Sequence, residues 1–204
     1  PMNEGLVPIR DILAPQPPLH LLLSAWSQQV GDLILGSEFL GVRLYNLIVR
    51  LAGILTIFWA ARTWFRSDRH ALAAAFIYMM LPIGFWWSIC LQSENVEIVF
   101  LMIAFVGVFR LDRNSLLWAG IASGLAMHIN MTAVPYFLSN FVFLLARRPK
   151  LVGWYLATTL PVWFGGAYLT YLWAGVDYLD NVLLNQVGSF PREEIIGPGR
   201  SEDR

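Results

Sequence analysis

Long, predominantly apolar runs constrain this chain more than any other feature of its sequence. Segments 40–64, 71–91 and 151–173 each reach the ~20 residues that a helix needs to cross a bilayer, and a shorter run covers 95–109. Of the 204 residues, 57% are hydrophobic and 14% are charged, whereas about a quarter of an ordinary soluble domain is charged. The sequence therefore predicts an all-α fold, a polytopic bundle of transmembrane helices.

Segment 115–146 does not fit a single span. As one helix it would be about 48 Å long, well beyond the ~30 Å hydrocarbon core. Its middle also holds His128, Asn130, Thr132 and Pro135. Two shorter helices that meet at this polar break explain the segment better, so the bundle is expected to contain one broken helical hairpin.

Positive charge gathers in three loops, and this supports the hairpin. Cytoplasmic loops are enriched in Lys and Arg, and the three loops share that side only if segment 115–146 enters the membrane and returns. The acids other than Asp68 and Asp112 then lie at or beyond the outer face. The three loops contain Arg62, Arg66 and Arg69, then Arg110 and Arg113, then Arg147, Arg148 and Lys150.

This topology divides the chain into three parts. Segment 42–174 forms the transmembrane bundle, and 175–204 is a polar tail at the outer face. Segment 1–41 is an outer-face loop with one or two interfacial helices, because the part after its prolines is amphipathic and too polar to span. We expect a multi-pass protein of the plasma membrane, whose active site faces the extracytoplasmic side.

Two arginines in the first span need a physical reason. Arg43, Asn46 and Arg50 share one helix face because they are spaced by three and four residues. A charged side chain inside a span is costly, so it lines a cavity or has a partner. Glu94 and Glu97 are the expected partners of Arg50. A structural Arg–Glu pair and a functional cavity are both open for Arg50, and Arg43 can also extend to lipid headgroups.

The histidines and the single cysteine give no sign of a metal site. His20, His70 and His128 are too scattered for metal-ligand spacing, and Cys90 alone forms no intramolecular disulfide. His128 and Asn130 either cap the turn of the hairpin or contact a ligand, and His20 is either an interfacial residue without a task or a ligand contact. The zero net charge gives no indication of a nucleic-acid partner.

Several short motifs, in order along nearly the whole chain, resemble one family. The likeness is to polytopic GT-C type glycosyltransferases, which include protein-mannosyltransferase-like and aminoarabinose-transferase-like enzymes. Their first outer loop carries "G-x-P-Y-R-D … P-P-L", followed by "R-L-x-S … A-R-R-x-F", an acidic residue at the exit of the third span, and "G-L-A-x-x-T-K". The corresponding stretches here are Gly5-Leu-Val-Pro-Ile-Arg-Asp11, Pro17-Pro18-Leu19, Arg43-Leu-Tyr-Asn46, Ala61-Arg-Thr-Trp-Phe65, the segment from Leu81 to Glu94, and Gly124-Leu-Ala-Met-His-Ile-Asn130.

The resemblance implies transfer of a sugar from a polyprenyl-phosphate-linked donor to an acceptor glycan, lipid or protein, with membrane lipid as the surroundings. It implies Asp11 and Glu94 as catalytic carboxylates and Arg43 at the lipid phosphate. Gln16 occupies a position that is often basic in the family, and Asn130 replaces the family's lysine. With His20 and Arg50, these residues complete the expected substrate-binding set. No cofactor is expected beyond the lipid-linked donor, and a metal requirement is left open.

Two other classes of protein remain as alternatives. Broken helices with intramembrane charges also occur in transporters, and a non-catalytic membrane scaffold is the third possibility. Since Pro1 stands only four residues before Gly5, we expect the chain to be the N-terminal transmembrane part of a longer enzyme. Its main catalytic acid would then lie upstream, and the fragment alone would be inactive.

Overall fold

The computed structural model describes residues 18–81 and 93–175, and the regular elements in these ranges are all helical. They are α1 (Pro18–Leu35), α2 (Glu38–Phe65), α3 (Asp68–Met80), α5 (Ser93–Arg110), α6 (Arg113–Ile129), α7 (Ala133–Arg147), the short 3₁₀ helix η2 (Pro149–Leu151) and α8 (Val152–Ala174). The all-α prediction is therefore confirmed for the described residues. Among these helices, α2 alone is both long and apolar enough to cross a membrane by itself. The multi-pass arrangement stays a prediction.

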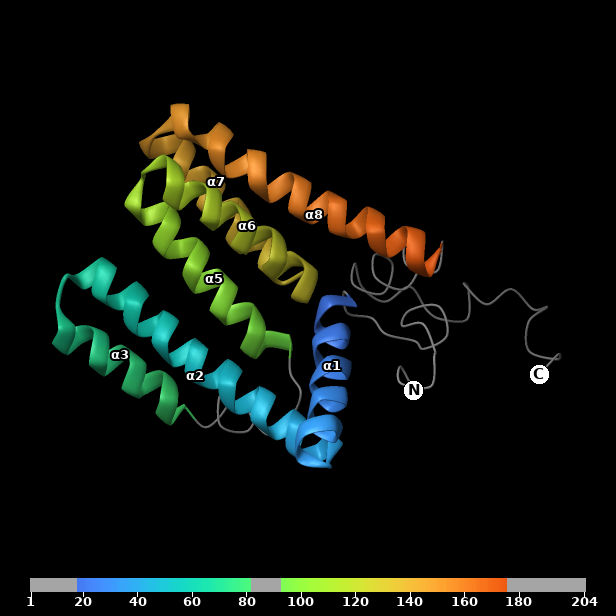
Figure 1. The fold of residues 1–204 in the computed structure, drawn as a ribbon. Helices are drawn as coiled ribbons and strands as arrows, with labels where there is room; N and C mark the ends of the chain where they lie inside the picture. The colour runs from blue at the N-terminus through green and yellow to red at the C-terminus, as the bar shows by residue number, and fades with distance from the viewer. Residues whose placement is uncertain (1–17, 82–92, 176–204) are drawn as a thin grey trace, which may run out of the picture.

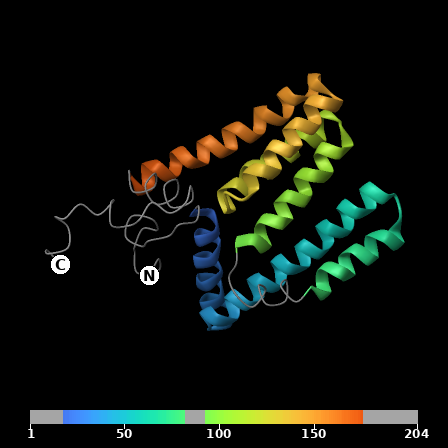
Figure 2. The same cartoon turned by 180° about the vertical axis from the view of Figure 1, so that it is seen from behind.

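The helices lie side by side in a row, in which α3 and α5 run antiparallel to α2 and α6, respectively, while the pairs α2–α5 and α6–α8 run parallel. Figures 1 and 2 show the order α3, α2, α5, α6, α8, with α7 returning along α5 and α6 and with α1 packed across the start of α2. The connections α2–α3, α5–α6 and α7–α8 consequently meet at the same end of the bundle. We call it the basic end, because it carries the eight cations of the three basic loops. The opposite end, the polar end, holds the starts of α2 and α5 and the connection between α6 and α7 (Figure 1).

The expected broken segment consists of two helices. The α-helix α6 ends at Ile129 and α7 begins at Ala133, so the chain reverses within three residues. Pro135 falls in the first turn of α7, where its missing N–H costs no helical hydrogen bond. The polar residues of the break thus mark the place where the chain turns back.

The expected span 71–91 differs from the structure. Helix α3 ends at Met80, and Leu81 has the extended backbone angles φ −60° and ψ 121°. Leu81 precedes Pro82, whose ring disfavours helical backbone in the residue before it. Residues 82–91 lie outside the described residues.

Small residues let α6 approach its neighbours closely. Gly120 and Gly124 are spaced as a small-xxx-small pair facing α8, and a methyl group on Gly124 would lie 2.7 Å from Cβ of Val162. On α5, Gly107 faces Ala119 in the same way. Close approach of helix backbones increases dispersion contacts, which drive association where lipid removes the hydrophobic effect. This seam packs α6 closely between α5 and α8.

Candidate functional site

A cluster of hydrogen-bonded polar side chains joins α5 to the break between α6 and α7. The hydroxyl of Thr132 donates to the carboxylate of Glu97, with Oγ1 2.7 Å from Oε1 and 2.9 Å from Oε2. Nδ2 of Asn130 donates to Oγ of Ser93 at 3.3 Å, and that hydroxyl lies 3.3 Å from Oε2 of Glu94. We call these five residues, Ser93, Glu94, Glu97, Asn130 and Thr132, the polar cluster.

Asn130 also organises the reversal of the chain. Its side-chain Oδ1 accepts a hydrogen bond from the backbone N–H of Thr132 at 3.2 Å, and its carbonyl accepts from Ala133 at 3.2 Å. These bonds satisfy backbone groups that the end of α6 and the start of α7 leave open. Asn130 therefore caps the turn and, through Nδ2, also belongs to the polar cluster.

The two carboxylates of the cluster have different surroundings. Glu97 is buried, at 4% exposure, and Thr132 contacts both of its oxygens. Glu94 lies one turn nearer the helix start and is half-buried, with Ser93 as its hydrogen-bond donor. Glu97 is positioned to hold the α5–α7 junction together, whereas Glu94 keeps an accessible carboxylate that can accept a proton from an incoming group.

The two arginines of α2 have different neighbours. Arg43 is exposed, and its guanidinium carbon lies 4.7 Å from the ring centre of Phe39 on the preceding turn. Arg50 donates from Nη2 to the carbonyl of Met79 at 2.7 Å, which is one of the carbonyls that the end of α3 leaves open. Arg50 thus ties α2 to the end of α3, and Glu97, one of its expected partners, bonds to Thr132.

The two described histidines with open roles are both buried. His20 lies in α1 at 4% exposure, and its carbonyl accepts from the hydroxyl of Ser24. Nε2 of His128 lies 3.1 Å from the carbonyl oxygen of Val162 and 2.8 Å from that of Trp163, so this nitrogen carries the proton and donates to α8. Gly166 leaves the space for the ring. His128 therefore joins α6 to α8, while Asn130 caps the turn.

The structure brings together two of the predicted site residues, Glu94 and Asn130. Asp11 and Gln16 lie outside the described residues. In 18–81 and 93–175, no group of three or more His, Cys, Asp or Glu side chains could hold a metal ion. Sequence reasoning did not assign a site role to Ser93 or Thr132. The available signal was the four-residue spacing of Ser93 and Glu97, which places both on the helix face that meets the break.

Comparison with known proteins identifies a family to which the chain is similar. The sequence model of the dolichyl-phosphate-mannose-protein mannosyltransferase family matches residues 16–164, which is more than half of the chain. The matched region begins at Gln16, five residues after Asp11, and includes all five residues of the polar cluster. Neither a curated protein nor a solved structure matches the chain.

Proposed function

Because the chain belongs to the dolichyl-phosphate-mannose-protein mannosyltransferase family, we propose that it contributes to transfer of a sugar from a polyprenyl-phosphate donor. The acceptor is a glycan, lipid or protein at the outer face of the membrane. The family match over residues 16–164 carries the coarse assignment, a membrane glycosyltransferase of the mannosyltransferase type. The donor, the acceptor and the side of the membrane are our proposal.

The position of charge supports the outer face as the side of the reaction. The three basic loops lie at one end of the bundle and the polar cluster lies near the other. If the basic end faces the cytoplasm, as the enrichment of Lys and Arg in cytoplasmic loops favours, the polar cluster faces outward. A donor phosphate at the outer interface would then lie at the level of the cluster.

In the proposed reaction, Glu94 is the general base. An acceptor hydroxyl oxygen attacks the anomeric carbon of the sugar and its proton passes to the Glu94 carboxylate. The bond from the anomeric carbon to the phosphate oxygen breaks, and polyprenyl phosphate leaves with the bonding electrons. Arg43, an exposed cation in the second turn of α2, would stabilise the negative charge that develops on the phosphate. Ser93 and Asn130 orient Glu94 through the hydrogen bonds described above.

Transfer from a radiolabelled polyprenyl-phosphate sugar tests this proposal. The assay uses membranes containing the full-length enzyme that carries this chain, in the native form or with Glu94→Gln. General base catalysis contributes about 10²- to 10⁴-fold, so Glu94→Gln should reduce transfer at least about 100-fold. The matched control is Glu38→Gln, which removes an exposed acid in the first turn of α2 at the same end. It should retain transfer.

Three outcomes would contradict the proposal. Normal transfer by Glu94→Gln at normal expression would remove Glu94 from the reaction. Uptake of free sugar without transfer to an acceptor would replace the transferase by the transporter alternative. Equal losses from Glu94→Gln and Glu38→Gln would indicate a general charge effect at this end, and the specific role of Glu94 would fail.

A further inference from the structure

We propose that the basic end of the bundle binds one anionic phospholipid, with its headgroup phosphate at Arg110 and an acyl chain in a cavity between α2, α5 and α6. This site lies at the end opposite the polar cluster. The inference requires that the chain lies in a membrane, and it does not depend on the sugar-transfer reaction.

The cavity has the lining that an acyl chain requires. Its volume is about 340 Å³, and Trp59 of α2, Ile103 of α5 and Trp118 of α6 form much of its wall. Arg110 and Ser115 stand at the connection of α5 and α6 and supply its polar groups. Trp118 is 68% exposed, so the cavity opens at the side of the bundle. An apolar chamber that ends at a cation suits an amphiphile with a negative headgroup.

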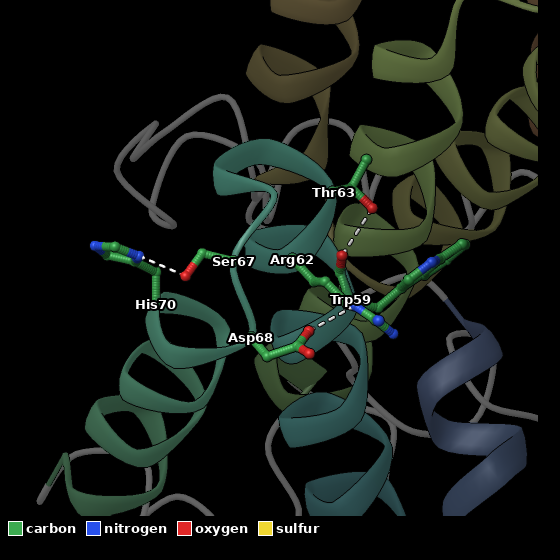
Figure 3. A network of polar contacts seen from close by, with 6 residues as sticks. All are labelled: Trp59, Arg62, Thr63, Ser67, Asp68 and His70. Atoms are coloured by element: carbon green, nitrogen blue, oxygen red, sulfur yellow. Dashed lines mark hydrogen bonds and ion pairs between the residues drawn. The ribbon is translucent and has the colours of Figure 1, made fainter.

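Arg110 is the cation that faces this cavity. Its side chain is exposed, and its guanidinium carbon lies 5.3 Å from the ring centre of Trp59. The neighbouring Arg62 turns toward Asp68, with Nε 2.8 Å from Oδ1, and Figure 3 shows that the Trp59 ring points away from Asp68. Asp68 is thus engaged by another arginine, Arg62.

The other acid of the basic end is also engaged locally. Oδ1 of Asp112 accepts a hydrogen bond from the backbone N–H of Ser115 at 3.0 Å, as the N-cap of α6. Asp68 and Asp112 are the two acids of the three basic loops, which contain eight cations. Clusters of Lys and Arg at the cytoplasmic side of membrane helices attract anionic lipids, and basic pockets between such helices bind their headgroups.

A second cavity shows why we place the lipid at Arg110. It has a similar volume, about 330 Å³, and lies between α2, α5 and α7. Its lining includes Trp64, Phe105, Phe109 and Tyr136, and none of its lining residues is charged. This cavity could accept any apolar chain without regard to the headgroup. Of these two cavities in the described part of the chain, the one that contains Arg110 is therefore expected to select a negative headgroup.

Native mass spectrometry of the purified full-length enzyme that carries this chain, in detergent, tests the site. Phosphatidylglycerol and phosphatidylcholine with the same acyl chains are compared at equal concentrations. One Lys or Arg near an anionic surface contributes about a fivefold change in affinity, so one phosphatidylglycerol should bind about fivefold more tightly than phosphatidylcholine. Arg110→Gln should remove this preference, and Arg110→Lys should retain it. Ile103→Trp, which fills the cavity, should weaken both lipids.

The matched control is Arg69→Gln, since Arg69 is an exposed cation at the same end but on α3. It should change the preference less than twofold. Equal losses from Arg69→Gln and Arg110→Gln would overturn the proposal in favour of diffuse surface charge. Equal binding of the two lipids by the native chain would also overturn it. If glycerol 3-phosphate displaced the bound lipid at similar concentration, the site would be an anion site without a lipid chain.

Two further readouts keep the result interpretable. Circular dichroism checks that each variant retains its helices. If Arg110→Gln fails to fold, the other two variants test the lipid site: Arg110→Lys should keep the preference for phosphatidylglycerol, and Ile103→Trp should weaken binding of both lipids. The sugar-transfer assay is run on Arg110→Gln in parallel, where transfer should remain because Arg110 lies away from the polar cluster. Loss of lipid preference with normal transfer supports the lipid site alone, and absence of transfer in the native protein leaves the lipid result unaffected.

Discussion

The two ends of the bundle hold their polar side chains in different ways. At the polar end, Thr132 bonds to Glu97 and Asn130 bonds to Ser93, and both bonds join residues more than 30 positions apart in the sequence. At the basic end, the charged side chains are exposed and bond to nearby residues or lie over aromatic rings. Contacts between distant residues fix the geometry of a site before a ligand arrives, whereas exposed arginines can adjust to a mobile headgroup.

Replacing Thr132 by Val should reduce the stability of the bundle more than a substitution at Asp112 or Arg113 of the basic end. The valine has the same shape but donates no hydrogen bond, so the buried carboxylate of Glu97 loses its described partner. Leaving a buried polar group unsatisfied costs about 1–3 kcal/mol, and bonds within membrane bundles reach about 1.7 kcal/mol. We expect the free energy of unfolding in mixed detergent micelles to fall by about 1–2 kcal/mol.

The chain offers a matched control for this change. Thr56 donates to the carbonyl of Ala52 within α2, so Thr56→Val removes a hydroxyl without breaking a contact between helices. We expect a loss below about 0.5 kcal/mol, typical of a substitution away from special features. Equal losses for the two variants would show that the polar end is not held by the Thr132–Glu97 contact. A double-mutant cycle with Glu97→Gln measures the coupling directly.

The sequence predicted the positions of the two ends but not the contacts within them. The break around Asn130 and the common location of the three basic loops followed from polarity and charge, which depend only on position along the chain. The Thr132–Glu97 bond and the contact of His128 with α8 depend on how each helix is rotated against its neighbour. Here that rotation follows from close packing at Gly120, Gly124 and similar residues, and no pattern in a single helix specifies it.

The early end of α3 shows a further limit of hydropathy. Segment 71–91 is apolar throughout, and its composition therefore predicted a full span. The backbone of Leu81 is set by the following proline, a local steric effect that an average over 20 residues does not detect. The Asp11 and Gln16 predictions stay predictions, because these residues lie outside the described part of the chain.

Asp112 provides an intermediate effect at the basic end. Replacement of this N-cap by Ala should lower the free energy of unfolding by about 1 kcal/mol at pH 7. The hydroxyl and the backbone N–H of Ser115 hold the pKa of Asp112 below its ordinary value of 3.8. A depressed carboxyl pKa stabilises the fold above the pKa of the unfolded chain, and this contribution is lost as pH falls through the folded value.

Unfolding of native protein and Asp112→Ala at several pH values measures this contribution. The difference between them should be constant from pH 7 to about pH 5 and should shrink below about pH 4. Asp112→Asn, which can still cap the helix, is the control and should lose less than Asp112→Ala at pH 7. A difference that grows on acidification would have the wrong sign for a carboxylate that the folded state stabilises.

Arg113 should show the smallest measurable effect, and it tests whether the basic end is held by aromatic contacts. Its guanidinium carbon lies 3.7 Å from the ring centre of Trp154, whereas that of Arg147 lies 6.0 Å from Phe143. A cation over an exposed Trp ring contributes about 0.5–1 kcal/mol, and the attraction fades near 6 Å. Arg113→Gln should therefore cost about 0.5 kcal/mol in unfolding titrations, and Arg147→Gln should cost less.

Arg113→Lys keeps the charge but loses the planar stacking, so its free energy of unfolding should lie between those of the native protein and Arg113→Gln. If Arg147→Gln cost more than Arg113→Gln, the positions of the charges, and not the aromatic contacts, would stabilise the loops of the basic end. The two ends of the bundle would then differ only in the burial of their polar side chains.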